Sequence, residues 1–139
     1  MSDSQPPAPG RGGWFRFVRL WGPALAAMAA IFVASSMSTL PPAAEEVSDK
    51  TLHFAAYATL GLLVLRAMAG GEWRGVTAGS ALRAWLLTVA YGASDELHQA
   101  FVPNRWVSLG DWLADAAGAG LAIVVALVWA MRGRTRRSL

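Results

Sequence analysis

The sequence predicts an all-α membrane protein with four transmembrane helices and with both termini in the cytoplasm. Of its 139 residues, 55% are hydrophobic and only 15% are charged, whereas an ordinary soluble domain is about 25% charged. Apolar segments recur along the chain, and arginine gathers at alternate ends of them. The spans are expected to be helical because a bilayer tolerates no unpaired backbone group, and so short a chain offers no closed barrel.

The first span is predicted over residues 17–39. Leu20–Ala44 holds 25 residues without an ionisable side chain, which is enough to cross the hydrocarbon core of a bilayer. Pro41 and Pro42 are expected to end the helix because proline cannot donate a backbone hydrogen bond. The stretch exceeds the roughly 7–15 apolar residues of a secretory signal peptide, so it is expected to be retained. Residues 1–12, rich in Pro, Gly and Ser, are expected to form a disordered tail.

Three further spans are predicted over residues 48–69, 79–101 and 108–131. Their expected boundary residues are Ser48, Gly70, Gly71, Pro103, and either Ser108 or Asp111. Serine and aspartate cap helix starts, glycine takes the left-handed turn after a helix, and proline disfavours helix in the residue before it. Only 15 residues separate Lys50 from Arg66, 11 separate Arg83 from Asp95, and 16 separate Asp115 from Arg132, whereas an apolar span holds roughly 20. Polar side chains are therefore expected within these helices.

The distribution of positive charge predicts the orientation. Ten basic residues fall at one set of helix ends: Arg11, Arg16, Arg19, Arg66, Arg74, Arg83, Arg132, Arg134, Arg136 and Arg137. Only Lys50 and Arg105 lie at the other. The positive-inside bias therefore predicts a multi-pass protein of the inner membrane, with a membrane domain over residues 13–131 and a basic cytoplasmic tail over 132–139. Directly after an apolar span, such a tail indicates contact with anionic lipid, and no nucleic-acid partner is expected.

This topology places most ionisable groups on the outer side of the membrane. The set contains both histidines and seven of the nine carboxylates: Glu45, Glu46, Asp49, Lys50, His53, Asp95, Glu96, His98, Arg105, Asp111 and Asp115. Helical spacing arranges many of them in stripes, which are Asp49, His53 and Tyr57; Tyr91, Asp95, His98 and Gln99; and Asp111, Asp115 and Gly118. An ionised residue that faces lipid at mid-helix costs roughly 2.5–3.5 kcal/mol. The three stripes are therefore expected to face one another or a wet cavity.

The residue types in these stripes suit more than one chemistry. Carboxylates and imidazoles handle protons or bind a divalent metal, while Lys50, Arg105 and the helix starts suit an anionic group. Alternatively, the two cations only neutralise Asp49, Asp95 or Glu96. The segment Asp95-Glu96-x-His98 is a weak metal signal because it lies on one helix without a second histidine, so no metal ligand is assigned and the cofactor stays open. Tyr57 and Tyr91 also suit the membrane interface. Four glycines, Gly61, Gly92, Gly118 and Gly120, are expected where helices pack closely.

Linked motifs in the last three predicted helices resemble the VanZ-like family. They are Asp49-Lys50-x-x-His53-Phe54-x-x-Tyr57, Tyr91-Gly92-x-x-Asp95-Glu96-x-His98-Gln99, Pro103-x-Arg105 and Ser108-x-x-Asp111, and the resemblance covers about residues 48–120. The chain departs from the family at Asn104, where glycine is common, and at Asp115, where asparagine is common. Some members of the family are linked to resistance to the glycopeptide antibiotic teicoplanin, and the resemblance implies such a link without assigning a molecular activity.

Two functions follow as hypotheses. The first is an enzyme that acts on a lipid-linked or cell-envelope anionic substrate, and the second is a non-catalytic protein that binds or passes a lipid or glycopeptide. A third, purely structural interpretation is that buried pairs only hold the helices together. The expected catalytic residues are His53, Asp95, Glu96, His98 and Asp111, and the expected substrate-binding residues are Asp49, Lys50, Tyr57, Tyr91, Gln99, Arg105, Ser108 and Asp115. Whether the protein is an enzyme stays open at this point.

Overall fold

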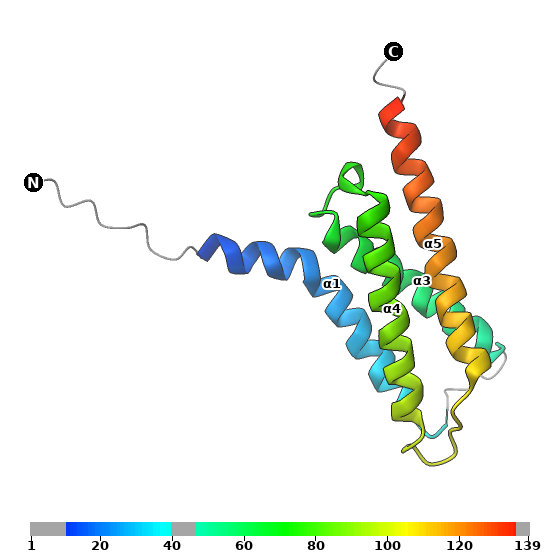
Figure 1. Cartoon of the computed structure of the whole chain (residues 1–139). Helices are drawn as coiled ribbons and strands as arrows, with labels where there is room; N and C mark the ends of the chain where they lie inside the picture. The colour runs from blue at the N-terminus through cyan, green and yellow to red at the C-terminus, as the bar shows by residue number, and fades with distance from the viewer. Residues whose placement is uncertain (1–10, 40–46, 136–139) are drawn as a thin grey trace, which may run out of the picture.

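The computed structural model describes residues 11–39 and 47–135, which form helices and turns without a strand. The described helices are α1 (Arg11–Ser35), α3 (Asp49–Met68), the short 3₁₀ helix η1 (Trp73–Gly75), α4 (Ala78–Gln99) and α5 (Leu109–Thr135). Figure 1 shows α3, α4 and α5 gathered together, while the first part of α1 projects away from them. The closest packing is between α3 and α5, and α1 lies mainly against α3.

The bounds of α1 differ from the prediction at both ends. The helix begins earlier, at Arg11, and it ends at Ser35 rather than near residue 39. The prolines expected to end it, Pro41 and Pro42, lie outside the described residues, as do Glu45 and Glu46. At this end, the hydroxyls of Ser35 and Ser36 both donate to the carbonyl of Phe32, at 3.2 and 2.7 Å, and the same carbonyl accepts the backbone N–H of Ser36.

A proline inside α1 links this helix to α3. Pro23 has no N–H to donate, so it leaves the carbonyl of Arg19, four residues earlier, without its helical partner. The guanidinium of Arg66, near the end of α3, donates to that carbonyl over 3.5 Å. Figure 1 shows α1 bending along its length, as helices do at proline. The sequence does not predict this contact.

The helix α3 lies within one residue of its predicted bounds at each end. Gly70 and Gly71 follow it with φ values of 74° and 91°, the left-handed conformation that glycine supplies after a helix. Ser48 occupies the position before the first turn, but its side chain makes no capping hydrogen bond. The expected cap by the Ser48 hydroxyl is therefore wrong, and Asp49 in the first turn faces the partly positive helix start instead.

The other two helices start with side-chain caps. Thr77 and Ser80 form a reciprocal capping box at the start of α4. Ser108 accepts a hydrogen bond from the backbone N–H of Asp111 at 3.2 Å, which selects Ser108 over Asp111 as the cap of α5. The predicted ends were two residues too late for α4 and four too early for α5. The last turn of α5 continues because Arg134 donates to the carbonyls of Arg74 and Val76.

The four expected close-packing glycines do lie where elements approach. A Cβ at Gly118 would collide with the backbone carbonyl of Phe54 on α3, and one at Gly61 would lie 3.2 Å from Ala119 on α5. Gly120 faces Trp85, and Gly92 faces Tyr57 and Asp115. Small residues thus let the backbones of α3 and α5 come close, which is the usual basis of helix packing in membranes.

Among the described residues, three helices are long and apolar enough to cross a membrane. They are α1 over Gly12–Ser35, α3 over Asp49–Met68 and α5 over Leu109–Thr135. The helix α4 is not among them, and it carries Arg83, Asp95 and Glu96. Large apolar side chains point outward from the helices, among them Phe15, Phe32, Leu86, Leu121 and Val125. Such a surface is suited to lipid rather than to water.

Candidate functional site

A cavity of about 380 Å³ lies among α1, α3, α4 and the turn that leads into α5. Six predicted site residues line it: Asp49, His53, Tyr57, Asp95, Gln99 and Arg105. The rest of its wall is largely apolar and includes Ile31 and Ala34 of α1, and Leu52 and Ala56 of α3. The cavity therefore combines an apolar wall with ionisable groups, and the predicted stripes of α3 and α4 both reach it.

Asp95 joins the site to α1. It is 4% exposed, and its Oδ1 accepts a hydrogen bond of 2.5 Å from the hydroxyl of Ser35. Gln99, one turn later on α4, donates to Oδ2 over 3.5 Å. Ser35 is not among the predicted site residues, because the first span was predicted only as an apolar crossing. The available signal was the pair Ser35-Ser36, polar residues at the outer end of an otherwise apolar helix.

His53 and Asp115 form a buried imidazole–carboxylate pair between α3 and α5. The ring Nδ1 of His53 lies 2.9 Å from Oδ1 of Asp115, and the Asp115 side chain is fully buried. The other oxygen, Oδ2, has no hydrogen-bond partner among the described residues. Gly92 makes the space for it, because a Cβ there would lie 2.9 Å from Oδ2. The packing of α4 against α3 and α5, and the pair of His53 with Asp115, thus both depend on Gly92.

Glu96 reaches the same interior from α4. It is 4% exposed, and its Oε2 accepts a hydrogen bond of 2.7 Å from the backbone N–H of Ser108. Within the described part of the chain, its Oε1 is buried without a partner. His53, Glu96 and Asp115 each offer one ligand atom, and these three atoms lie within 4.8 Å of one another. Three helices therefore converge on one point.

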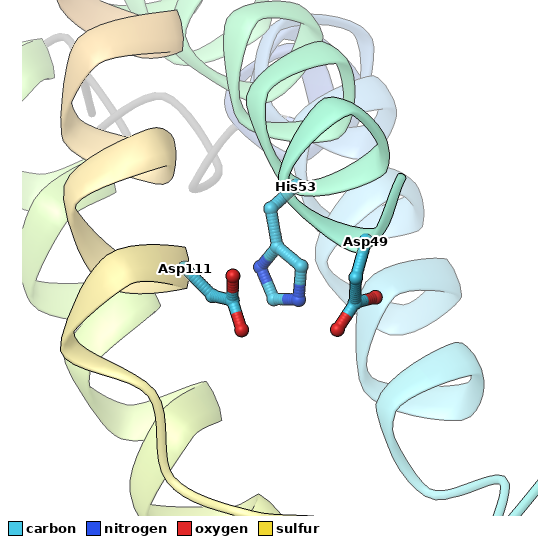
Figure 2. Close-up of side chains that lie close together, drawn as sticks. All are labelled: Asp49, His53 and Asp111. Carbon is cyan, nitrogen blue, oxygen red and sulfur yellow. The ribbon is translucent and has the colours of Figure 1, made fainter. Parts of the chain in front are cut away.

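His53 also belongs to a second group, with Asp49 and Asp111. Figure 2 shows the imidazole between the two carboxylates, one from α3 and one from α5, and their ligand atoms also lie within 4.8 Å of one another. Here the carboxylates already have cationic partners. Lys50 Nζ lies 3.3 Å from Asp111 Oδ1, and Arg105 Nη1 lies 3.9 Å from Asp49 Oδ1.

The predicted partners of the two cations are partly wrong. Lys50 pairs with Asp111, across the gap between α3 and α5, and not with Asp49, Asp95 or Glu96. Only the pair of Arg105 with Asp49 was anticipated. The reason is geometric: Lys50 is in the first turn of α3, where its long side chain lies over the start of α5 beside Gly110.

Two predicted residues of α4 face α1 instead of the ionisable groups. The ring of His98 lies 4.5 Å from that of Phe32, and its Nε2 is 3.0 Å from the Ser36 hydroxyl. The hydroxyl of Tyr91 donates to the carbonyl of Met28 over 2.7 Å. Neither side chain lines the cavity. Both side chains connect α1 to α4. His98 therefore lies outside the cavity, although its spacing from Asp95 predicted a place beside the other ionisable groups.

The site carries an excess of acidic groups. Among the described residues, five carboxyl groups, those of Asp49, Asp95, Glu96, Asp111 and Asp115, lie near only two permanent cations, Lys50 and Arg105. Buried carboxylates need protons, donors or cations to offset the loss of hydration. The arrangement is therefore suited to proton transfer or to holding a cation.

A family model, VanZ/LLP1, matches residues 15–130 of the chain. The matched range includes every residue of the cavity and of the two groups around His53. No curated protein and no solved structure matches the chain.

Proposed function

The chain belongs to the VanZ/LLP1 family, and from that premise we propose that it is a membrane-embedded enzyme. Its substrate is an anionic, lipid-linked or otherwise amphiphilic component of the cell envelope. Family membership alone does not assign an activity, so the proposal is argued from the site. Its reaction centre is the group of acidic and imidazole side chains around His53.

The proposal includes four membrane spans, with the site near the outer surface of the inner membrane. Besides α1, α3 and α5, the helix α4 is the additional span. Its 22 residues extend about 33 Å, close to the roughly 30 Å of a hydrocarbon core. Its acidic residues Asp95 and Glu96 are buried, so they do not face lipid. The excess of arginine at the opposite helix ends supports cytoplasmic termini.

The observation that carries the proposal is the amphiphilic cavity. Its apolar wall lies between α1 and α3, two helices apolar enough to cross a membrane, and its polar end holds His53 and Asp95. Ligand cavities usually combine an apolar lining with a few placed polar groups. A substrate with an apolar tail and a polar head fits this division, because the tail stays in apolar surroundings while the head meets the ionisable groups.

The two cations are suited to the anionic head. Lys50 is 65% exposed, and the ion pair of Arg105 with Asp49 is long, at 3.9 Å, with Asp49 47% exposed. Ion pairs with an exposed partner contribute only about 0–1 kcal/mol, so a substrate anion can replace the half-exposed Asp49 beside Arg105 at little cost, whereas Asp111 is only 11% exposed and stays paired with Lys50. Arg105 is also fixed by its Nε, which donates to the Met37 carbonyl at 3.1 Å.

A turnover assay with purified protein tests the proposal. Lipid phosphates and lipid-linked cell-wall precursors are offered to the wild type, to His53→Ala and to the control Thr59→Val, which changes an exposed residue on the same helix. We expect His53→Ala to lower turnover by at least about 10²-fold with an unchanged circular dichroism spectrum, and the control to keep full turnover. If the wild type binds the substrate without changing it chemically, the proposed enzyme is wrong and the protein is a binding protein.

The link of the family to teicoplanin resistance is proposed for this member as a consequence of the same reaction. Expression of the wild type in a sensitive host is expected to raise the inhibitory concentration of teicoplanin, and expression of His53→Ala to the same membrane level is expected not to. An equal effect of both forms would separate resistance from this site.

A further inference from the structure

We propose that His53, Glu96 and Asp115 bind one divalent transition-metal cation between α3, α4 and α5. Each residue comes from a different helix, and their potential ligand atoms lie within 4.8 Å of one another. From the sequence, the carboxylates and imidazoles as a group suit a divalent metal, and Asp95-Glu96-x-His98 is the only motif named for one. In the structure, His98 of that segment faces Phe32 of α1. The histidine that lies beside Glu96 is His53 of α3.

Two unpaired oxygens point to the cation. Oε1 of Glu96 and Oδ2 of Asp115 are buried, and neither has a hydrogen-bond partner among the described residues. Glu96 is 4% exposed and Asp115 is fully buried. Buried polar atoms are nearly always paired in native proteins, and an unpaired one calls for an explanation. One cation placed among the three side chains gives both oxygens a partner.

The local charge supports the same conclusion. Lys50 and Arg105 pair with Asp111 and Asp49, so neither serves Glu96 or Asp115. With a neutral imidazole, the two buried carboxylates carry two negative charges, which one divalent cation offsets. The group of His53 with Asp49 and Asp111, drawn in Figure 2, is the weaker candidate because its carboxylates already have cationic partners.

The ligand types indicate which cations fit. One imidazole with two carboxylates suits Zn²⁺, Mn²⁺ or Fe²⁺, whereas Mg²⁺ and Ca²⁺ prefer oxygen ligands alone. Three protein ligands leave a coordination position open for a substrate oxygen or water. Glu96 is also held in place, since its other oxygen accepts the Ser108 N–H at 2.7 Å, and hydrogen bonds of this kind orient metal ligands.

The role of the cation rests on the proposed function, although its binding does not. A cation at this point would lie at the polar end of the cavity, because His53 also lines that cavity. It would hold and polarise the anionic head of the substrate. His53 then acts as a ligand, and His53→Ala loses turnover because the cation is lost.

Metal content tests the inference without any substrate. Protein purified in detergent is stripped with a chelator, reloaded separately with Zn²⁺, Mn²⁺ and Mg²⁺, freed of excess metal and analysed by mass spectrometry for metal per chain. We expect about one equivalent of Zn²⁺ or Mn²⁺ in the wild type, and a loss of at least ten-fold in Glu96→Gln and Asp115→Asn. The matched control is Asp95→Asn, which changes a buried carboxyl on α4 that is bonded to Ser35 and Gln99, and it should keep its metal.

A second measurement, made on the wild type alone, tests the inference even if the variants do not fold. The wild type itself should melt at a lower temperature after chelation and recover on addition of the cation, because a ligand that binds only the folded state stabilises it. Absence of bound metal in the reloaded wild type, or equal loss in Asp95→Asn and Glu96→Gln, would overturn the inference. Turnover by the metal-free protein would overturn the role of the cation in the reaction and leave the enzyme standing, whereas bound metal without turnover on any lipid-linked substrate would overturn only the enzyme.

Discussion

Asp115 is the ionisable residue most tightly enclosed by its neighbours. It is fully buried, it is hydrogen-bonded to His53, and Gly92 leaves just enough room for its second oxygen. Residue-scale experiments should therefore target the partners of individual buried oxygens.

Ser35→Ala is expected to destabilise the protein by about 1–3 kcal/mol, because it removes the donor from a buried oxygen of Asp95. Ser36→Ala is the matched control, since the Ser36 hydroxyl is exposed and serves the Phe32 carbonyl and His98; it should change stability by less than about 0.5 kcal/mol. Chemical unfolding in detergent measures both. Equal effects of the two substitutions would show that the Ser35–Asp95 contact does not stabilise the fold.

At the scale of elements, α3 and α5 form the centre of the fold. They approach each other at Gly61 and Gly118, where any side chain would meet the opposite helix. The same approach places His53 beside Asp115 and Lys50 beside Asp111. The polar contacts between these helices thus depend on small residues further along the interface.

Gly118→Ala is expected to push α5 away from α3, because the new methyl group would collide with the Phe54 carbonyl, a backbone atom that cannot rotate aside. The expected destabilisation is about 1–3 kcal/mol, with loss of the His53–Asp115 contact. Gly133→Ala, on the same helix with nothing near its Cβ, is the control and should not destabilise. A Gly118→Ala protein with wild-type melting temperature would argue against this packing.

Local signals determined how far the elements could be predicted. Gly70 and Gly71 located the end of α3 because a left-handed turn has a distinct residue preference. The end of α1 was predicted too late because it was placed from Pro41 and Pro42, whereas the helix ends at Ser35. In the site, helical spacing correctly grouped Asp49, His53 and Tyr57, which all line the cavity.

Contacts between helices could not be predicted, because they depend on rotation and relative height. Spacing placed His98 on the stripe of Asp95, but it could not show that α1 lies beside that stripe, where Ser35 meets Asp95 and Phe32 meets the ring of His98. For the same reason, the ion pair of Lys50 with Asp111 could not be predicted. The grouping of Glu96 with His53 and Asp115 could not be predicted either. Contacts to backbone carbonyls, such as Tyr91 to Met28, leave no pattern in the sequence at all.

At the scale of the whole molecule, charge and polarity divide the bundle into two ends. One end holds the arginines of the connection between α3 and α4 and of the last turn of α5, while the other holds the cavity and the two groups around His53. The proposed envelope substrate requires this second end to face the outside of the inner membrane, whereas binding of the proposed cation does not depend on the orientation. The orientation is therefore a premise of the proposed function.

Single cysteines can test that orientation cleanly, because the native chain contains none. Pro103→Cys lies in the exposed turn between α4 and α5, and Glu72→Cys lies in the exposed connection between α3 and α4. With a membrane-impermeant maleimide on intact spheroplasts, we expect labelling of the first variant and protection of the second until the membrane is broken. The positive-inside bias gives this sign, because arginine is retained on the cytoplasmic side. The opposite pattern would place the cavity in the cytoplasmic leaflet, and an envelope substrate could then not reach His53. Labelling of both sites in sealed spheroplasts would mean that α4 does not cross the membrane, which would leave Asp95 and Glu96 in a three-span protein.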